Sequence, residues 1–170
     1  MIVRFKRLHP DAVVPFKTYP EDFCYDVVAT SEEQIAPNVW KYGIGLAFEI
    51  GGKPDDDVLY SEFGVEIHRF PKSREYRNRD YIVSLDLRPR SSIYKTGMVL
   101  SNAVGTVDDL YRGEVSAIFY HVFPDMPRYR VGDRIGQIKL GITLPLEFEE
   151  VDELRQTARG DGGYGSTGRG

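Results

Sequence analysis

Alternating large and small or polar residues mark several stretches of this 170-residue chain as β-strands. The clearest runs from Val39 to Ile50. Large side chains stand there at every second position from Trp40 onward, and small or charged residues stand between them. A period of two places the large residues on one buried face of a strand. The two glycines at 51 and 52 then end it.

Shorter runs of the same kind predict further strands at residues 2–8, 12–17, 81–87, 115–123, 134–140 and 142–148. The run at 115–123 is apolar on both faces, which predicts a strand buried on both sides. Pro145 places the last strand at a sheet edge, and residues 91–97 predict one helical turn. No segment keeps a period of 3.6 and no internal repeat is found. Many short strands separated by turns predict an all-β sandwich or barrel.

The stretch from Asn102 to Glu114 carries the most suggestive chemistry. Gly105 and Gly113 bracket a turn that contains Asp108. We expect a β-hairpin here, with a backbone that a flat ligand can approach closely because glycine has no Cβ. A carboxylate held on such an element suits a general base. Taken alone, the pattern is more typical of an ordinary turn.

Two segments depart from the strand pattern. Residues 51–80 contain three adjacent aspartates at 55–57 and a small apolar piece at 63–70, and we interpret the segment as an inserted hairpin or long loop. Adjacent aspartates favour a solvated loop over a metal site, which needs separated, converging ligands. The tail from Ala158 to Gly170 holds six of the 17 glycines. This composition fits a flexible end or a glycine-rich phosphate cradle.

Composition narrows the classes of partner and compartment. The net charge of −4 argues against a nucleic-acid polymer as partner. A single cysteine, Cys24, excludes an intrachain disulfide, and three widely separated histidines imply no zinc site. No apolar run approaches the roughly 18 residues of a membrane span, and the first residues lack the pattern of a signal peptide. We therefore expect a soluble, cytoplasmic protein without membrane contact.

Five segments, in order, resemble the five motifs of the trimeric dUTPase family: Tyr25–Val27, Pro89–Ser92, Gly105–Gly113, Gly132–Gln137 and Arg159–Gly168. The resemblance implies a dUTPase-like distorted jelly-roll or β-clip barrel over residues 1–158, with 51–80 as an insertion. It also implies a flexible C-terminal arm at 159–170 that closes the active site of a neighbouring subunit in a homotrimer.

The activity that the resemblance implies is hydrolysis of dUTP to dUMP and pyrophosphate, with Mg2+ bound to the triphosphate. This activity lowers dUTP and supplies dUMP for thymidylate synthesis. Asp108 corresponds to the family's base, which activates the water that attacks the α-phosphorus. Asp26 corresponds to the carboxylate that holds a water of the Mg2+ shell, an outer-sphere role. Three subunits share each active site in the family, so an isolated monomer is expected to be inactive.

The resemblance also assigns substrate contacts. Those at the phosphates are Arg90, Ser91, Ser92 and Gln137. Those at uracil are Asn102, Gly105, Thr106, Val107 and Ser116, with Tyr111 beneath the deoxyribose. The arm contributes Arg159, Tyr164, Gly165, Ser166 and Thr167, with Tyr164 stacking on uracil.

Two departures from the family pattern stand out. Phe23 and Cys24 replace the usual Ala-Gly of the first motif, and Leu110 replaces a second Asp in the third. The neighbouring Asp109 would face the other way in a strand. One alternative function is a dCTP deaminase-like or bifunctional nucleotide enzyme, which would need a catalytic glutamate in a third-motif pattern of its own, and Gly105–Gly113 lacks that arrangement. Another is a dUTPase-derived regulatory protein, against which Asp108 and the full tail weigh.

Overall fold

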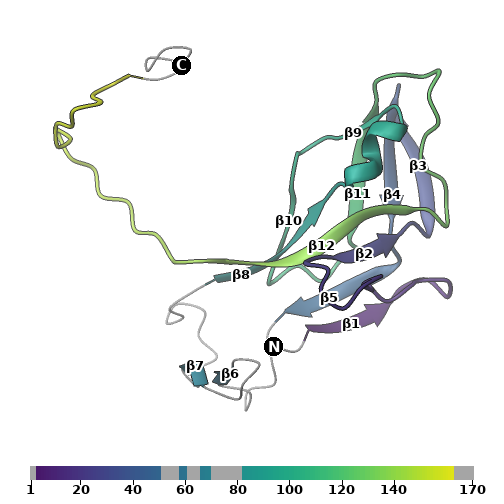
Figure 1. The fold of residues 1–170 in the computed structure, drawn as a ribbon, viewed down its shortest axis with the longest axis horizontal. Coiled ribbons are helices and arrows are strands. Elements are labelled where there is room, and N and C mark those ends of the chain that lie inside the picture. Colours follow the sequence, from purple (N-terminus) through teal and green to yellow (C-terminus); the bar gives the residue numbers. More distant parts are fainter. Residues whose placement is uncertain (1–2, 51–57, 61–65, 70–81, 163–170) are drawn as a thin grey trace.

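The computed structural model describes residues 3–50, 58–60, 66–69 and 82–162 (Figure 1). These ranges contain strands and one short 3-10 helix, η2, and no α-helix, so the all-β prediction is confirmed. No helix in the described ranges has the length and apolar character needed to cross a membrane. The elements are β1 Val3–Arg7, β2 Tyr25–Val28, β3 Ser31–Ala36, β4 Val39–Gly43, β5 Leu46–Ile50, β6 Val58–Tyr60, β7 Glu66–Arg69, β8 Ile82–Arg88, η2 Ser91–Lys95, β9 Met98–Leu100, β10 Gly105–Asp108, β11 Ser116–His121 and β12 Arg134–Thr143.

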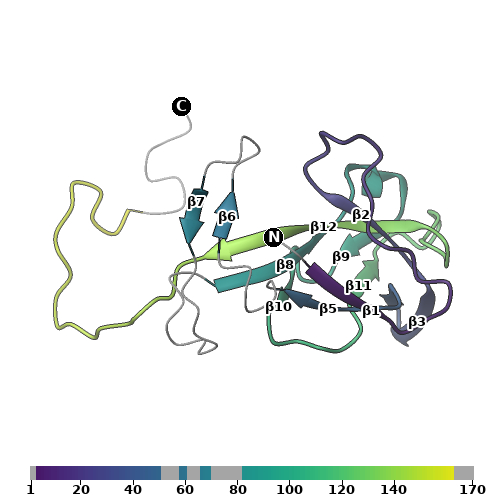
Figure 2. The same ribbon diagram turned by 90° about the horizontal axis from the view of Figure 1, so that it is seen from below.

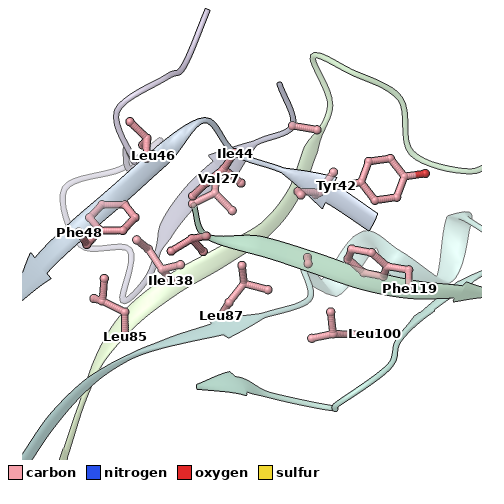
Figure 3. Packing of buried hydrophobic residues seen from close by; sticks show 14 of the residues in the cluster. Val27, Tyr42, Ile44, Leu46, Phe48, Leu85, Leu87, Leu100, Phe119 and Ile138 are labelled. Atoms are coloured by element: carbon pink, nitrogen blue, oxygen red, sulfur yellow. The ribbon is translucent and has the colours of Figure 1, made fainter. Parts of the chain in front are cut away.

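Two four-stranded antiparallel sheets form the body, with strand orders β10-β8-β12-β2 and β3-β4-β11-β9. A further pair, β1-β5, adds apolar side chains to the same core. Figure 3 shows this core, in which buried residues of both sheets pack together: Val27, Leu87 and Ile138 from the first, Tyr42, Leu100 and Phe119 from the second, and Leu46 and Phe48 from β5. Burying these side chains is the main source of stability for such a fold.

The alternating run at 39–50 forms two strands instead of one. The break lies at Gly45, whose φ of 67° is in the left-handed region that favours glycine. There the chain leaves β4, which pairs with β3 and β11, and enters β5, which pairs with β1. The predicted buried face is nevertheless confirmed, since Tyr42, Ile44 and Leu46 are all almost inaccessible. The alternation of side chains therefore predicted which face of this stretch is buried, but it did not indicate that the chain changes from one sheet to another.

Three further expectations about strands need correction. Residues 12–17 form no strand, and only Phe16 makes an isolated bridge, to Asp26. Conversely, β3 and β9 were not predicted, because β3 is mostly polar and exposed and β9 has only three residues. Strand β11 is buried on one face only, and Tyr120 is 52% exposed. The one-turn helix expected at 91–97 is confirmed as η2.

The segment at 102–114 is not a hairpin. Strand β10 pairs with β8, whereas β11 pairs with β4 and β9. The chain between them therefore crosses from one sheet to the other. The glycines at 105 and 113 flank this crossover, which resembles a hairpin turn in sequence because both need tight, polar connections.

Strand β12 is longer than predicted, with ten residues that run to Thr143 (Figure 2). Residues 144–148, expected as part of a final strand, have no strand partner in the described structure. Their large side chains are exposed, Leu144 at 67% and Phe148 at 94%. In the predicted insertion at 51–80, β6 and β7 pair antiparallel, and the rest of that segment lies outside the described residues.

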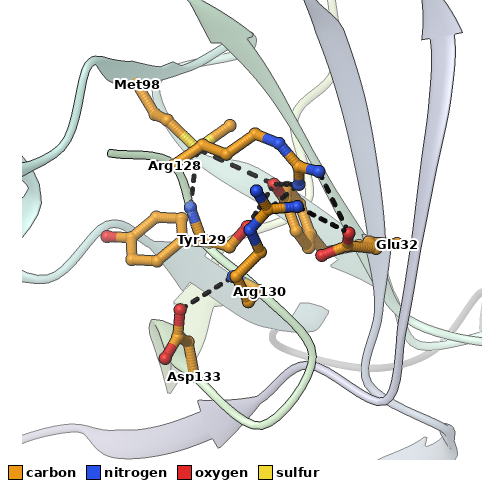
Figure 4. A network of polar contacts seen from close by, with 7 residues as sticks. Glu32, Met98, Arg128, Tyr129, Arg130 and Asp133 are labelled. Carbon is orange, nitrogen blue, oxygen red and sulfur yellow. Dashed lines mark hydrogen bonds and ion pairs between the residues drawn. The ribbon is translucent and has the colours of Figure 1, made fainter. Parts of the chain in front are cut away.

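A polar network joins the β3-β4 hairpin to the loop before β12 (Figure 4). Arg128 donates to Glu32 Oε1 at 3.1 Å and to Tyr42 Oη at 3.2 Å, and its guanidinium lies 3.5 Å from the centre of the Trp40 ring. Arg130 also donates to Glu32 Oε1, at 3.3 Å. The hydrogen bond from Arg128 is the largest effect that lowers the pKa of Glu32. This network fixes the loop that leads into the fourth motif.

We expect Glu32→Gln to lower the free energy of unfolding at neutral pH by about 1–3 kcal/mol, because it removes a charged partner of Arg128. A carboxyl whose pKa is lower in the folded chain than in the unfolded chain stabilises the fold at pH values above its ordinary pKa, which is 4.5 for Glu32. That contribution is lost as the pH falls from there through the folded pKa. Denaturant unfolding across pH 3–7 (about the range in which acidic groups titrate) measures it. The adjacent, exposed Glu33→Gln is the control. Parallel stability curves for Glu32→Gln and the unmodified chain would contradict the assignment.

Candidate active site

The outer face of the β10-β8-β12-β2 sheet is polar and carries many of the predicted site residues. The opposite face packs into the core through residues such as Leu85, Leu87 and Ile138. Because directly paired residues share a face, the strand register brings three rows of residues together on the outer face. The rows are Asp108, Ser84 and Gly141; Thr106, Asp86 and Lys139; and Arg88, Gln137 and Asp26.

Asp108 lies at one end of this face, as the last residue of β10. It is exposed and borders a cavity of about 600 Å³. Ser84, Asp86 and Thr106 also line this cavity. A carboxylate on a strand end beside an open cavity has the position that a general base requires, since both water and a ligand can reach it.

Asp109 does not turn away from this cavity as the strand alternation predicted. Strand β10 ends at Asp108, and the next two residues form a turn. Both Asp108 and Asp109 line the cavity, together with Leu110, which is 64% exposed. Asp109 itself is buried, with 6% of its surface exposed. A second carboxylate is therefore near Asp108, although it occupies a different position of the motif from the usual one.

The predicted uracil contacts lie along β10, which is an edge strand of its sheet. One edge of Gly105 to Asp108 pairs with β8, so the other edge presents main-chain N–H and C=O groups that no neighbouring strand covers in the described structure. The Asn102 amide is close to this strand, since a Cβ on Gly105 would stand 3.5 Å from Asn102 Nδ2. The structure thus brings together Asn102, Gly105 and Thr106, with Val107 turned toward the core.

Tyr111 and Ser116 occupy the crossover between the sheets. Tyr111 Oη donates to the main-chain oxygen of Glu114 at 3.0 Å, and its ring packs over Gly113 so closely that a Cβ there would clash. The Glu114 carboxylate accepts the Gly45 N–H at 2.8 Å and ties the crossover to the β4-β5 break. Ser116 opens β11 opposite Gly43, in the other sheet. Its predicted contact with uracil stays a prediction.

A second group of predicted residues lies at the far end of the same sheet. Asp26 accepts hydrogen bonds from Arg90 Nε at 3.1 Å and from Arg134 at 2.9 Å. Gln137 is paired with Asp26 in the strand register, and its amide donates to Pro89 O at 3.1 Å. Ser91 and Ser92 follow Arg90 at the start of η2, Ser91 exposed and Ser92 partly so. Arg134 had no role in the sequence analysis, although the fourth motif contains it.

These two groups are too far apart to act on one reacting bond. Asp108 lies opposite Ser84, and Gln137 lies opposite Arg88, four residues further along β8. That offset is about 13 Å along the strand, and the three strand spacings from β10 to β2 add about 14 Å across it. The Cα atoms of Asp108 and Asp26 are therefore separated by roughly 19 Å within one chain.

The predicted arm residues are only partly described. Arg159 is exposed and donates to Gly162 O at 2.8 Å within a turn. Figure 1 shows the chain after β12 running away from both sheets. Tyr164, Gly165, Ser166 and Thr167 lie outside the described residues.

The two-sheet β fold, with a carboxylate on its edge strand and an arginine pair at its far end, has the features of an all-β nucleotide hydrolase. A model of the dUTPase family matches residues 84–168, which include the second to fifth motifs. Deoxyuridine 5'-triphosphate nucleotidohydrolase of Nautilia profundicola is 30% identical over 99% of this chain and 100% of its own length. The enzyme of that name from Rhodococcus erythropolis is 34% identical over 98% of this chain and 85% of its own. The chain belongs to the dUTPase family.

Solved structures support the fold. A point mutant of the dUTPase of Staphylococcus bacteriophage 80alpha, with dUpNHpp, superposes with a TM-score of 0.69, covers 99% of both chains and is 17% identical. A point mutant of the dUTPase of phage phi11, described with a structural Mg(II) ion, has a TM-score of 0.61 at 15% identity, over 92% of this chain and 100% of its own. The jelly-roll-like dUTPase fold predicted from the motifs is therefore confirmed.

Proposed function

We propose that this protein is a dUTP diphosphatase, which hydrolyses dUTP to dUMP and pyrophosphate. The observation that carries the proposal is the family match, whose residues include the carboxylate beside the cavity and the second and fourth motifs. The names of the two bacterial relatives given above describe this activity. Acting in the cytoplasm, the enzyme lowers dUTP, keeps uracil out of DNA and supplies dUMP for thymidylate synthesis.

Asp108 is the proposed base of the reaction. A triphosphate carries about four negative charges at neutral pH, so water attacks its α-phosphorus only when the water is aligned and charge is neutralised. Asp108 orients that water and takes its proton as the new P–O bond forms and pyrophosphate leaves. Its exposure and its place on the cavity wall support this role. Positioning and charge stabilisation by the phosphate contacts supply the rest of the rate enhancement.

The unpaired edge of β10 is the proposed recognition site for the base of the nucleotide. Uracil presents an acceptor, a donor and an acceptor, and main-chain groups of Gly105 to Val107 with the Asn102 amide provide complementary partners. Cytosine reverses two of these groups and would leave polar atoms unpaired, which is strongly disfavoured. Tyr111 lies beneath the deoxyribose, where a 2′-hydroxyl would clash. Its ring is held over Gly113 by its bond to Glu114, which supports this placement.

We infer that the active unit is a homotrimer with shared active sites. Asp108 and the Asp26 group are about 19 Å apart in one chain, whereas two P–O–P linkages join the α- and γ-phosphorus atoms of a substrate. This separation supports a site in which the base and the phosphate-binding arginines come from different subunits. The exposed alternating side chains Leu144, Leu146 and Phe148 are suited to packing against a neighbouring copy. The arm at 159–170 is proposed to close over a neighbour's substrate.

Mg2+ is the proposed cofactor. It neutralises charge on the triphosphate, and it keeps several waters and needs few direct protein ligands. The described residues contain no cluster of three or more His, Cys, Asp or Glu side chains that could hold a metal. Among them, Asp26 would hold a water of the metal shell. Its two oxygens already accept bonds from arginines and keep further lone pairs for such a water.

A nucleotide panel tests the function. We expect pyrophosphate from dUTP in the presence of Mg2+, and little from dTTP, dCTP or UTP. Discrimination of at least about 10³-fold is expected because a mismatched base leaves buried polar groups unpaired. Ammonia released from dCTP would instead indicate the deaminase-like alternative. Absence of any turnover, with dUTP still bound, would indicate a regulatory protein.

A further inference from the structure

One carboxylate holds two arginines at the far end of the polar sheet face. Asp26 Oδ1 accepts a hydrogen bond from Arg90 Nε at 3.1 Å, and Asp26 Oδ2 accepts one from Arg134 at 2.9 Å. Asp26 is well covered, with 14% of its side chain exposed, while Arg90 and Arg134 are 27% and 41% exposed. The carboxylate therefore lies beneath two guanidinium groups that reach the surface.

The charges of this group do not cancel. Two guanidiniums share one carboxylate, and Arg90 and Arg134 have no other ion pair among the described residues. The group thus carries one net positive charge in a chain whose net charge is −4. Gln137, paired with Asp26 in the register, adds a neutral amide. Such a surplus, held on a rigid sheet, attracts an anion.

The arginines also keep free hydrogen-bond donors. Arg90 uses its Nε, and Arg134 uses one terminal nitrogen for both Asp26 and Thr18. Among the described residues, no partner is found for the two terminal nitrogens of Arg90 or for the other terminal nitrogen and Nε of Arg134. A guanidinium with free, fixed donors matches the oxygens of a phosphate group, often in a bidentate way.

We propose that Arg134 is a further phosphate-binding residue of the enzyme, and that Asp26 acts as a positioning residue that holds Arg90 and Arg134 side by side. The pair binds the β- and γ-phosphates of the substrate, away from the α-phosphorus at which Asp108 of another subunit acts. The inference rests on the proposed function, because it assumes a triphosphate ligand. It gives Asp26 a role that does not depend on a metal.

The two possible roles of Asp26 predict different dependence on metal. A carboxylate that only holds a water of the Mg2+ shell matters for binding when Mg2+ is present and not in its absence. A carboxylate that orients two arginines matters in both conditions, because the loose guanidiniums no longer present their donors together. Binding of the triphosphate analogue dUpNHpp with Mg2+ and with EDTA separates these cases without any turnover.

The test uses Asp26→Asn and Arg134→Met in the full-length protein, with Arg130→Met as the matched control. Arg130 lies four residues before Arg134, is more exposed and pairs with Glu32 instead of Asp26. We expect Arg134→Met and Asp26→Asn each to weaken dUpNHpp binding roughly 10- to 100-fold, with Mg2+ and with EDTA. Binding of dUMP, which has no β- or γ-phosphate, should change little, and Arg130→Met should change neither.

Arg134→Lys is the control for a folding defect, because it keeps the positive charge but removes the planar guanidinium that binds phosphate through two donors. We expect this variant to lose affinity to an intermediate extent at an unchanged Tm. Unchanged dUpNHpp affinity in Arg134→Met would overturn the proposal for Arg134. A loss in Asp26→Asn that appears only with Mg2+ would overturn the positioning role of Asp26.

Hydrolysis of dUTP by the unmodified protein is measured in parallel. Its absence would count against the proposed function, whereas its presence with normal Arg134→Met binding counts against this inference alone.

Discussion

Replacing Asp108 with Asn is expected to slow dUTP hydrolysis by about 10²–10⁴-fold, the range that general-base assistance supplies. The amide has nearly the same shape and cannot take a proton from the attacking water. Asp108 is exposed and belongs to no ion pair in the described residues, so its replacement should leave the fold intact. Affinity for dUpNHpp should remain within a few-fold, because the side chain acts on water and not on the phosphates. Steady-state kinetics, binding and thermal melting measure the three quantities.

The exposed Asp125→Asn is the matched control, since it removes the same charge on the loop between β11 and β12. Near-normal turnover by Asp108→Asn would show that another group activates the water. Asp109 is then the first residue to examine, because it lines the same cavity. Its own substitution is harder to interpret, since the side chain is buried and its loss is expected to affect folding.

The sequence predicted the fold class and the buried faces well, because both depend on local side-chain period. The residues from Tyr42 to Ile50 show this, since their alternation identified core positions that the structure buries. It could not reveal the change of sheet at Gly45. That change depends on pairing with β1 and β11, which are distant in sequence. For the same reason the pattern at 102–114 predicted a hairpin, although β10 and β11 find partners in different sheets.

The site was predicted through its motifs and not through geometry. Asp26, Arg90 and Gln137 come from three separate segments, and the structure brings them to one end of a sheet. No spacing in the sequence indicates that Arg90 and Arg134 share a carboxylate, because that contact arises from the pairing of both β2 and β8 with β12. Asp109 was misjudged because alternation was extended past the end of β10. The roles of individual residues toward a substrate stay predictions.

The separation between Asp108 and the arginine pair leads to the second large effect, complementation between inactive subunits. Asp108→Asn and Arg90→Met should each lower the activity of a homotrimer strongly, the latter by about 10²-fold or more, as loss of one charge-stabilising donor does. Neither variant supplies both groups to any site. We expect heterotrimers of the two, isolated by a different tag on each, to recover about a third of the unmodified activity.

The expected fraction follows from cyclic symmetry. Suppose that each active site takes Asp108 from one subunit and Arg90 from the next. A trimer that contains both variants then has one active site of three in which Asp108 and Arg90 are both present, whichever variant occurs twice. If both groups came from the same chain, every site would lack one of them. Mixed trimers no more active than the better homotrimer would therefore disprove the shared site. Trimers of Asp108→Asn with the unmodified chain, which should lose activity only in proportion to the variant subunits, control for assembly and tags.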